Sequence, residues 1–553
     1  MRYVTAGQPP RRPAIVFVSP AEHRRVVFAS SLGTVFEWYD FYLYATLAPF
    51  FASLFFPPGN DTAALLSALA TYAAGFLIRP FGAIFFGRIG DQLGRKYAFL
   101  ITIVLMGTST FAVGLLPTYE HIGWAAPLML VLLRLAQGFA LGGEYGGAAT
   151  YVAEHTPPSR RGLATSWIQT TATVGFLLSL LVIIVCRGII PTDDFKEWGW
   201  RIPFLVSIVL LIFSAYIRLR LNESPLYQHM KEAGQISEAP ISESFFRFPN
   251  AWYVLLALLG ATAGQGVVWY TGQFYALFYL QITLKADYDV AYQLMMIALI
   301  IGTPFFILFG WLSDKIGRKP IILAGCLLAA LTYFPIFSAL TKAVNPDLAA
   351  FQRSVNVALN TDTETCRFHI FVGPWTEFSD CDRAKDYLTK LGLSFDTVHR
   401  PGGPSSIKVG DLPELPIENW EAEDRRHNVM LALSIRGYPM KASVAKMNKP
   451  KTIFLLVVMM IYVCMVYGPM AAFLVDLFPA RIRYTSLSLP YHIGNGWFGG
   501  MLPLVATAMV AASGNIYYGL WYPVCIAGMT FIVGLFFMPD RRVQDSPRAI
   551  DKS

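Results

Sequence analysis

Long apolar segments recur along most of the chain, and short polar connections separate them. A helix of about 20 apolar residues is long enough to cross ~30 Å of hydrocarbon. The apolar runs are continuous and lack the alternation of a membrane β-barrel, so they would cross a bilayer as helices. The pattern predicts twelve membrane-spanning helices, at residues 27–50, 64–86, 97–117, 126–152, 163–186, 202–221, 251–281, 291–313, 319–341, 452–478, 485–511 and 516–538.

Two longer polar segments divide this series. One separates the sixth and seventh spans, and the other, which is charged and has no apolar run of spanning length, separates the ninth and tenth. We therefore expect an all-α polytopic membrane protein with two six-helix bundles. The expected parts are a tail at 1–26, a first bundle at 27–221, a linker at 222–250, a second bundle at 251–341 and 452–538, an insert at 342–451, and a tail at 539–553.

A short motif occurs once in each half, between two predicted spans. Residues 86–96 and 309–319 share Phe, Gly, Asp, Gly, Arg and Lys at six equivalent positions. Glycine permits a tight turn and close helix approach, and Asp caps a helix start or pairs with a nearby Arg. Arg95 and Lys96 are expected to anchor at the anionic membrane surface. The repeat indicates a duplicated transporter with pseudo-symmetric halves. The motif positions are Gly87, Asp91, Gly94, Arg95, Lys96, Gly310, Asp314, Gly317, Arg318 and Lys319.

A second motif marks the ends of the fourth and tenth spans. Its charged residues are Glu154, Arg160 and Arg161 in the first half and Asp476, Arg481 and Arg483 in the second. The first motif repeats at an offset of 223 residues, from 91 to 314, and the second at 322, from 154 to 476. The offsets differ by 99, so an insertion of about that length lies between the two motifs of the second half, where residues 342–451 are found.

Composition and charge agree with a membrane protein. The chain is 55% hydrophobic and only 14% charged, which is too little charge for the surface of a soluble protein of this length. Its net charge is +8, and the basic residues gather on alternate connections, whereas the connections near 51–63, 117–127 and 512–516 have no Lys or Arg. Cytoplasmic loops are enriched in Lys and Arg, so both termini are expected in the cytoplasm and the insert on the opposite side. This use of basic residues requires no nucleic-acid partner. The polar, basic N-terminal segment does not predict a cleavable signal peptide.

The insert is expected to form a small α/β subdomain. Residues 368–372 and 395–398 resemble strands, and residues 382–391 have helical character. Cys366 and Cys381 would face an oxidising compartment, so we expect a disulfide, which would close a loop of ~15 residues and contribute about 3 kcal/mol. Isolated His369 and His399 lack the spacing of metal ligands, and no metal site is predicted. The other cysteines, Cys186, Cys326, Cys464 and Cys525, are interpreted as packing residues.

Four charged residues inside predicted spans are candidates for transport chemistry. Glu37 and Asp40 are three residues apart and share a helix face. Carboxylates in a span are costly unless they face a cavity or a partner, so either one could carry a coupled proton or only hold the bundle together through an ion pair. Arg79 and Arg134 offer a bidentate fork for a substrate carboxylate. The alternative is that they are charge partners of the acidic residues in spans, which include Glu144.

Polar and aromatic groups in two further spans are candidates for lining a cavity. They are expensive in lipid unless they face one, although core packing is the ordinary interpretation of any single member. His492 could also titrate near neutral pH. The candidates are Gln265, Trp269, Tyr270, Gln273 and Tyr275 in the seventh span, and His492 and Asn495 in the eleventh.

Longer stretches resemble the metabolite–proton symporter family of the major facilitator superfamily. The resemblance extends over nearly the whole chain except the insert and the tails. The stretches that carry it are Glu37-Trp-Tyr-Asp40-Phe, Gly75-Phe-Leu-Ile-Arg79-Pro80-Phe-Gly82, Arg134 to Gly147, Trp198-Gly-Trp-Arg201-Ile-Pro203-Phe, and Tyr467 to Tyr484. The resemblance implies a substrate site at mid-membrane, proton symport, and a rocking type of alternating access. It also implies that the loop motif is a cytoplasmic gate and that Arg134 takes part in coupling. The family includes transporters for proline and betaine, α-ketoglutarate, citrate and shikimate.

The sequence thus predicts a proton-coupled symporter that imports a small polar metabolite. Buried arginines favour an organic acid as substrate, whereas the resemblance equally allows a zwitterionic osmolyte of the proline or betaine type. A membrane sensor that binds a ligand with its insert is the other alternative. No phosphate-binding loop and no nucleophile–base pair is recognisable in the sequence, so neither an ATP-driven pump nor an enzyme is favoured, and no cofactor is expected. The expected location is the bacterial inner membrane, with the lipid bilayer, a proton and the substrate as partners of a monomer.

Overall fold

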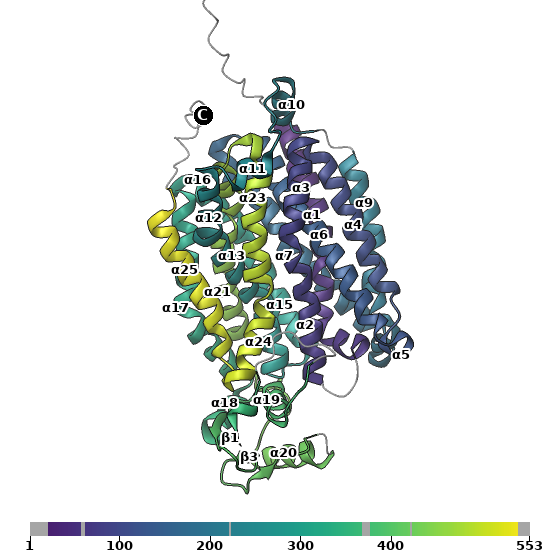
Figure 1. Ribbon diagram of the computed structural model, residues 1–553, viewed down its shortest axis with the longest axis vertical. Coiled ribbons are helices and arrows are strands. Elements are labelled where there is room, and N and C mark those ends of the chain that lie inside the picture. The colour runs from purple at the N-terminus through teal and green to yellow at the C-terminus, as the bar shows by residue number, and fades with distance from the viewer. Residues whose placement is uncertain (1–19, 57–60, 220–222, 368–375, 421–422, 540–553) are drawn as a thin grey trace, which may run out of the picture.

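The fold is described from a computed structural model for residues 20–56, 61–219, 223–367, 376–420 and 423–539. Within these residues, eleven helical segments are long and apolar enough to cross a membrane. The 36-residue helix α1 (Pro20–Phe55) packs beside them against α7. The expectation of an all-α membrane protein with two helical bundles is confirmed (Figure 1), and α1 occupies the place of the remaining predicted span, 27–50.

The N-terminal half contributes six of these segments. The second is made by α2 (Asp61–Leu77) and α3 (Arg79–Gln92), which meet at Ile78 because Pro80 suits a helix start and not a helix interior. The others are α1, α4 (Arg95–Leu115), α6 (Ala125–Glu154), α7 (Arg161–Ile189) and α9 (Arg201–Leu219). Short helices α5 (Tyr119–Ile122) and α8 (Thr192–Asp194) lie in the connections.

The C-terminal half repeats this arrangement with more irregular helices. Its first segment runs from Asn250 to Thr283 as α12 (Asn250–Ala257), α13 (Ala263–Tyr270) and α14 (Ala276–Phe278) with π-helical turns between them. π-Helical turns often occur at functional sites, and a further one, η8 (Ile493–Gly500), joins α23 (Arg483–His492) to α24 (Leu502–Ser513). The remaining segments are α15 (Tyr288–Gly302) with α16 (Pro304–Ile316), α17 (Arg318–Val344), α21 (Lys449–Tyr467) with α22 (Met470–Leu477), and α25 (Trp521–Phe537).

The linker and the insert lie at opposite ends of the bundle (Figure 1). The linker contains α10 (Pro225–Glu232) and α11 (Pro240–Phe245), and we call its side of the molecule the linker end. The insert contains α18 (Pro346–Ser354), α19 (Asp380–Lys390), α20 (Glu423–Ile435) and a small sheet, and we call its side the insert end.

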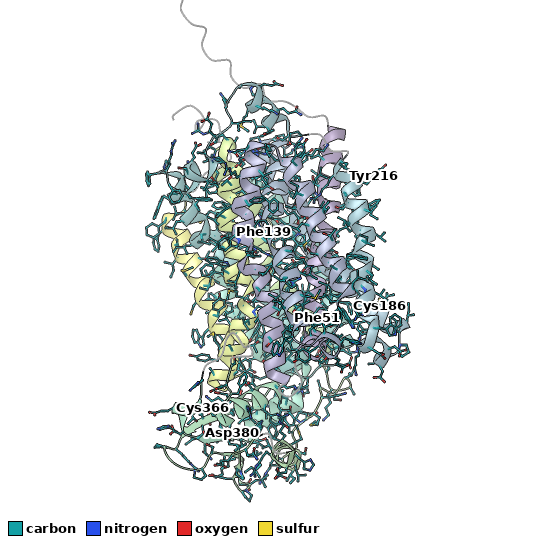
Figure 2. The ribbon with its side chains drawn as sticks, turned by 45° about the vertical axis from the view of Figure 1, so that its right-hand side comes forward. Phe51, Phe139, Cys186, Tyr216, Cys366 and Asp380 are labelled. Atoms are coloured by element: carbon teal, nitrogen blue, oxygen red, sulfur yellow. A yellow bond between two sulfur atoms is a disulfide. The ribbon has the colours of Figure 1, made fainter. Side chains whose placement is uncertain are left out.

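The insert is an α/β subdomain built on a four-stranded sheet in the order β2-β1-β3-β4. Strand β1 (Val357–Thr361) pairs in parallel with β2 (Asp396–His399) and antiparallel with β3 (Ser406–Val409), which pairs with β4 (Leu415–Pro416). The predicted helix and the second predicted strand correspond to α19 and β2. The first predicted strand, 368–372, lies outside the described residues. The Cys366–Cys381 disulfide is present, with Cα atoms 5.4 Å apart (Figure 2).

Candidate transport site and gates

The loop motif of the N-terminal half joins the two halves at the linker end. Asp91 Oδ2 accepts hydrogen bonds from Thr485 N at 2.9 Å and Thr485 Oγ1 at 2.7 Å, at the start of α23. Arg95 Nη2 lies 3.2 Å from Asp91 Oδ1 and 3.8 Å from Glu154 Oε1. Arg483 Nη1 of the other half lies 3.3 Å from the same Glu154 oxygen. An acid of the first half therefore caps a helix of the second half, where a negative charge is favourable.

The loop motif of the C-terminal half makes the mirror arrangement. Asp314 accepts hydrogen bonds from Gly162 N at 2.8 Å and Leu163 N at 2.9 Å, at the start of α7. Arg318 pairs with Asp314 and with Asp476, and Arg161 Nη1 of the other half lies 2.7 Å from Asp476 Oδ1. The two capped helix starts, at Leu163 of α7 and Thr485 of α23, are also 322 residues apart, the same offset that relates Glu154 to Asp476. Together these two charge clusters, which we call the linker-end gate, close this end of the seam between the halves.

The gate corrects one expectation about the basic residues. Arg95 is fully buried and does not anchor at a membrane surface, because it is the counter-ion of two buried carboxylates. Lys96 Nζ donates to Leu219 O at 2.9 Å at the end of α9, and Lys319 Nζ donates to Met538 O at 2.8 Å after α25. Each lysine thus satisfies carbonyls at the end of its half's last helix.

The remaining motif residues serve the turns and the surface. Gly94 and Gly317 have φ angles of 122° and 98°, which favour glycine, at the turns that start α4 and α17. Gly87 and Gly310 lie where the two halves approach closely, against Thr485 and Ser166. Arg481 is exposed and pairs with Glu243 of the linker, and Arg160 is exposed.

A layer of tyrosines lies beneath the linker-end gate. Tyr145 of α6 stacks on Tyr491 of α23, with ring centroids 3.4 Å apart and planes at 4°. The Tyr491 hydroxyl lies 2.7 Å from the Tyr467 hydroxyl, and Gln169 Nε2 donates to Tyr145 Oη at 2.7 Å. This contact between halves has no signal in the sequence, since tyrosines within apolar runs are ordinary packing residues.

Glu37 has a partner that the sequence analysis missed. Arg218 Nη2, near the end of α9, lies 2.7 Å from Glu37 Oε1 and 3.8 Å from Glu144 Oε1. Arg218 falls inside the predicted span 202–221 but was not among the charged residues considered for transport chemistry. Two buried carboxylates share one guanidinium here, so one bound proton would balance the charge of the cluster.

Asp40 is connected to Arg134 through two polar side chains. Thr110 lies close to the Asp40 carboxyl, and its hydroxyl donates to Met106 O at 3.0 Å. Gln137 Nε2 donates to Thr110 Oγ1 at 2.8 Å, and Arg134 Nη1 donates to Gln137 Oε1 at 2.5 Å. All four side chains are buried. The structure therefore brings two predicted functional residues, Asp40 and Arg134, to the two ends of one buried polar network.

Arg79 and Arg134 lie close to the same aromatic ring. The guanidinium carbons of Arg79 and Arg134 are 4.3 Å and 4.8 Å from the centroid of Phe41, the neighbour of Asp40 in sequence. Arg79 also lies close to Tyr270 and His492 of the other half. Its Nε and Nη2 have no hydrogen-bond acceptor among the described residues, so this buried group has donors left for a ligand.

The predicted amides do not share one role. Gln265 and Asn495 bond to each other, with Gln265 Nε2 donating at 3.0 Å and Asn495 Nδ2 donating at 2.7 Å. This reciprocal pair satisfies both amides within the C-terminal half, which favours a structural role in this conformation. Gln273 instead crosses between halves, since its Nε2 donates to Thr173 Oγ1 of α7 at 3.2 Å.

Aromatic side chains fill the centre of the seam beside these charges. Tyr42 stacks near Trp38 and Trp269, with ring centroids 5.2 Å and 5.7 Å away. Trp269 contacts Tyr270 at 4.8 Å, which joins this cluster to Arg79. Trp269 Nε1 has no hydrogen-bond partner among the described residues. Tyr275 lies apart, packed on Phe337 in the C-terminal half.

The seam is also closed at the insert end. Arg187 Nε of α7 lies 2.9 Å from Asp289 Oδ1 of α15, and Tyr292 Oη donates to Thr46 O at 3.2 Å. Asp289 is half exposed in this pair, whereas the Arg95 pairs of the linker-end gate are fully buried. With both ends in contact, the polar and aromatic centre is enclosed.

The family follows from a sequence comparison. The sequence profile of the Major Facilitator Superfamily matches residues 30–349, which is more than half of the chain. The chain belongs to this superfamily. Within it, the chain is 36% identical over 337 residues to the proline/betaine transporter of Escherichia coli, covering 60% of this chain and 67% of the relative.

Other superfamily members are similar over different lengths. The α-ketoglutarate permease of Escherichia coli is 38% identical over 337 residues, covering 60% of this chain and 76% of the relative. A glycine betaine/proline/ectoine/pipecolic acid transporter of Dickeya dadantii is 29% identical over 529 residues, covering 94% of this chain and 84% of the relative. A solved structure of the proton:xylose symporter XylE has the same fold, with a TM-score of 0.62 and 16% identity over 96% of this chain and 98% of that chain.

Proposed function

We propose that this superfamily member is a proton-coupled symporter that imports a small metabolite bearing a carboxylate. The observation that carries the proposal is the buried polar network of Asp40, Thr110, Gln137 and Arg134, in which hydrogen bonds join Arg134 to Gln137 and Gln137 to Thr110, and Thr110 lies close to Asp40. Protonation of Asp40 removes a charge from one end of the network, and a carboxylate neutralises the other end. Protonation of Asp40 and binding of the substrate carboxylate therefore stabilise the same closed state.

Arg79 and Arg134 are the proposed carboxylate ligands, with Tyr270, Gln273 and His492 around them. Arg79 supports this role with its remaining donors, and both guanidinium groups lie against Phe41. Glu37 is proposed to assist coupling through the cluster that it forms with Arg218 and Glu144. Gln265 and Asn495 would reach the substrate only if their mutual pair opened.

Alternating access is proposed to proceed by rocking of one half against the other around this centre. Opening the linker end must break the linker-end gate and the tyrosine layer, and opening the insert end must break the Arg187–Asp289 pair. The basic connections support a cytoplasmic linker end and cytoplasmic termini, so the insert would face the other side. We propose a monomer in the inner membrane as the functional unit.

Transport in proteoliposomes tests the coupling. We expect Asp40→Asn to abolish accumulation driven by a pH gradient and to retain exchange of substrate for substrate, because the binding arginines remain. Asp193→Asn is the matched control, since Asp193 is exposed in the connection between α7 and α9. Full accumulation by Asp40→Asn would show that this carboxyl does not carry the proton.

A second candidate substrate is a zwitterion with a quaternary or secondary ammonium group. The aromatic cluster of Trp38, Tyr42 and Trp269 favours it, because the faces of such rings attract organic cations. It lies next to Arg79, so one ligand could place its carboxylate on the guanidinium and its ammonium on the rings. Competition of organic acids against betaine and proline in the same uptake assay separates the two candidates. No competition by any of them would contradict both, and would favour a sensor.

A further inference from the structure

The insert is fixed to the C-terminal half at three places. The first is the connection after α24, where Phe395 N donates to Gly514 O at 2.8 Å and Ser394 Oγ accepts from Ile516 N at 3.4 Å. Lys385 Nζ of α19 donates to Ala512 O in the last turn of α24 at 3.2 Å. Backbone contact here is close, since a Cβ on Gly514 would lie 2.3 Å from Phe395 O.

The second place is the end of the segment that carries Trp269, Tyr270 and Gln273. A Cβ on Gly392 would lie 2.0 Å from Thr283 O, and Lys285 Nζ donates to Lys390 O. The insert is therefore in backbone contact with the helix that supplies the C-terminal side of the proposed substrate site.

The third place is the pair of chain connections through which the insert enters and leaves the membrane region. Ala442 N donates to Lys285 O at 3.0 Å, and Asn448 N donates to Ala343 O at 2.8 Å. Asn345 Nδ2 donates to Leu284 O at 3.0 Å. The three places tie together the insert-end termini of four spanning segments of one half, namely α24, Asn250–Thr283, α17 and α21.

Helix α19 of the insert also reaches the other half. It packs against α2, which belongs to the N-terminal half, as well as against α24 and the end of the Asn250–Thr283 segment. In Figure 1, α19 lies directly beyond the insert-end terminus of α2. The capping box of Ser379 and Asp382 and the Cys366–Cys381 disulfide fix the start of this helix within the insert.

From this arrangement we infer that the insert is a lid carried by the C-terminal half, which lies across the seam and holds the insert end closed through α19 and α2. Hydrogen bonds at three places make the insert move with the C-terminal half. Rocking that opens the insert end must therefore separate α19 from α2, and the lid opposes that motion. Helices of the membrane region alone would close this end only through contacts such as Arg187–Asp289.

The native cysteines provide the measurement. Cys186 is buried at the insert-end terminus of α7, against Tyr39 of the same half, and precedes Arg187 of the Arg187–Asp289 pair (Figure 2). Opening of this end breaks that pair and releases the end of α7, so we expect the alkylation rate of Cys186 to report the opening. Cys326 and Cys464 are buried within the C-terminal half and report unfolding. Alkylation of the purified full chain, followed by mass spectrometry of each cysteine peptide, measures the two events separately.

Two glycines supply undocking variants with matched controls. Gly392 and Gly514 have φ angles of 69° and 74°, and their added Cβ atoms would collide with the docking backbone. Gly402 and Gly437 have φ angles of 66° and 81° and no atom within 4 Å of an added Cβ. Alanine at any of the four introduces similar backbone strain, but only Gly392→Ala and Gly514→Ala push the insert away.

We expect Gly392→Ala and Gly514→Ala to raise the alkylation rate of Cys186 several-fold, with Cys326 and Cys464 unchanged. Gly402→Ala and Gly437→Ala should match the parent chain. Hydrogen exchange at the Phe395 and Ala442 amides confirms undocking in the double variant. If the insert undocks and the Cys186 alkylation rate does not change, the proposal that the insert is a lid is wrong. Equal acceleration at all three cysteines would show that the variants unfold, and would also contradict the proposal. Unchanged protection of both amides in the double variant would contradict the anchors themselves. None of these readouts requires transport, so the result does not depend on the proposed substrate or coupling.

Discussion

Arg218 is the single positive charge of a buried cluster that contains Glu37 and Glu144. Its side chain is 4% exposed, so its removal leaves two carboxylates in the membrane without a counter-ion. Breaking a buried pair in this way costs about 3–5 kcal/mol. We predict that Arg218→Ala lowers the melting temperature of the purified chain by many degrees and that Glu37→Gln in the same chain restores part of the loss. Arg88→Ala, which removes an exposed arginine at the linker end, should melt like the parent. Equal melting of all these chains would contradict the cluster.

Asp386 makes the stability of the insert depend on pH. Burial and the neighbouring Asp382 raise the pKa of Asp386 to about 7. The folded insert holds this proton more tightly than the unfolded chain, whose Asp titrates near ~4. The stabilisation is therefore complete below about pH 4, falls as the pH rises to about 7, and then stays low, with a total change on the order of 4 kcal/mol.

Asp386→Asn should remove this pH dependence and protect the insert at pH 8. Hydrogen exchange of the α19 amides, corrected for intrinsic rates, measures it in the full chain between pH 5 and 8. Asp396→Asn is the control, since Asp396 is exposed on the edge strand β2. The prediction is wrong if the parent and Asp386→Asn show the same pH profile.

At the scale of elements, each loop-motif acid caps a helix of the opposite half. Asp314 accepts two backbone N–H groups at the start of α7, and an Asn side chain would present only one acceptor oxygen and no charge. We expect Asp314→Asn to weaken this cap by about 1 kcal/mol and to speed hydrogen exchange at Gly162 and Leu163. Asp91→Asn should do the same at Thr485. Exchange that remains unchanged at the capped amides would refute the cap.

The elements were largely predictable because their signals are local or repeated. Span-length apolar runs predict the helices, and the offsets of 223 and 322 locate the insert from four motif positions. Strand β1 was not predicted, because its five residues follow α18 closely and pair with strands far along the chain.

The partners of the candidate side chains could not be predicted, because they too lie far away in the sequence. Arg218 meets Glu37 across 181 positions of sequence, and Gln265 meets Asn495 across 230. No periodicity within one helix encodes which face of another helix it will meet. The sequence therefore indicates which residue types are costly in a membrane, and only the packed helices show how each cost is offset.

At the scale of the whole molecule, the two ends of the seam should respond in opposite directions to one substitution. In rocking-type alternating access, a state open at the linker end is closed at the insert end. Asp314→Asn weakens only the linker-end gate, so it should increase the population open at that end. A change of about 1 kcal/mol shifts the equilibrium about five-fold.

The alkylation rate of Cys186, at the insert end of α7, measures this change in population. We predict that Asp314→Asn slows Cys186 alkylation by up to about five-fold, although Asp314 and Cys186 lie at opposite ends of the seam. Arg88→Ala, at the linker end but outside the gate, should leave the rate unchanged. A general loosening of the molecule would instead speed alkylation in Asp314→Asn. An increase or an unchanged rate would therefore contradict a rigid coupling between the linker-end gate and the insert end, whereas a decrease requires the two halves to move as single bodies.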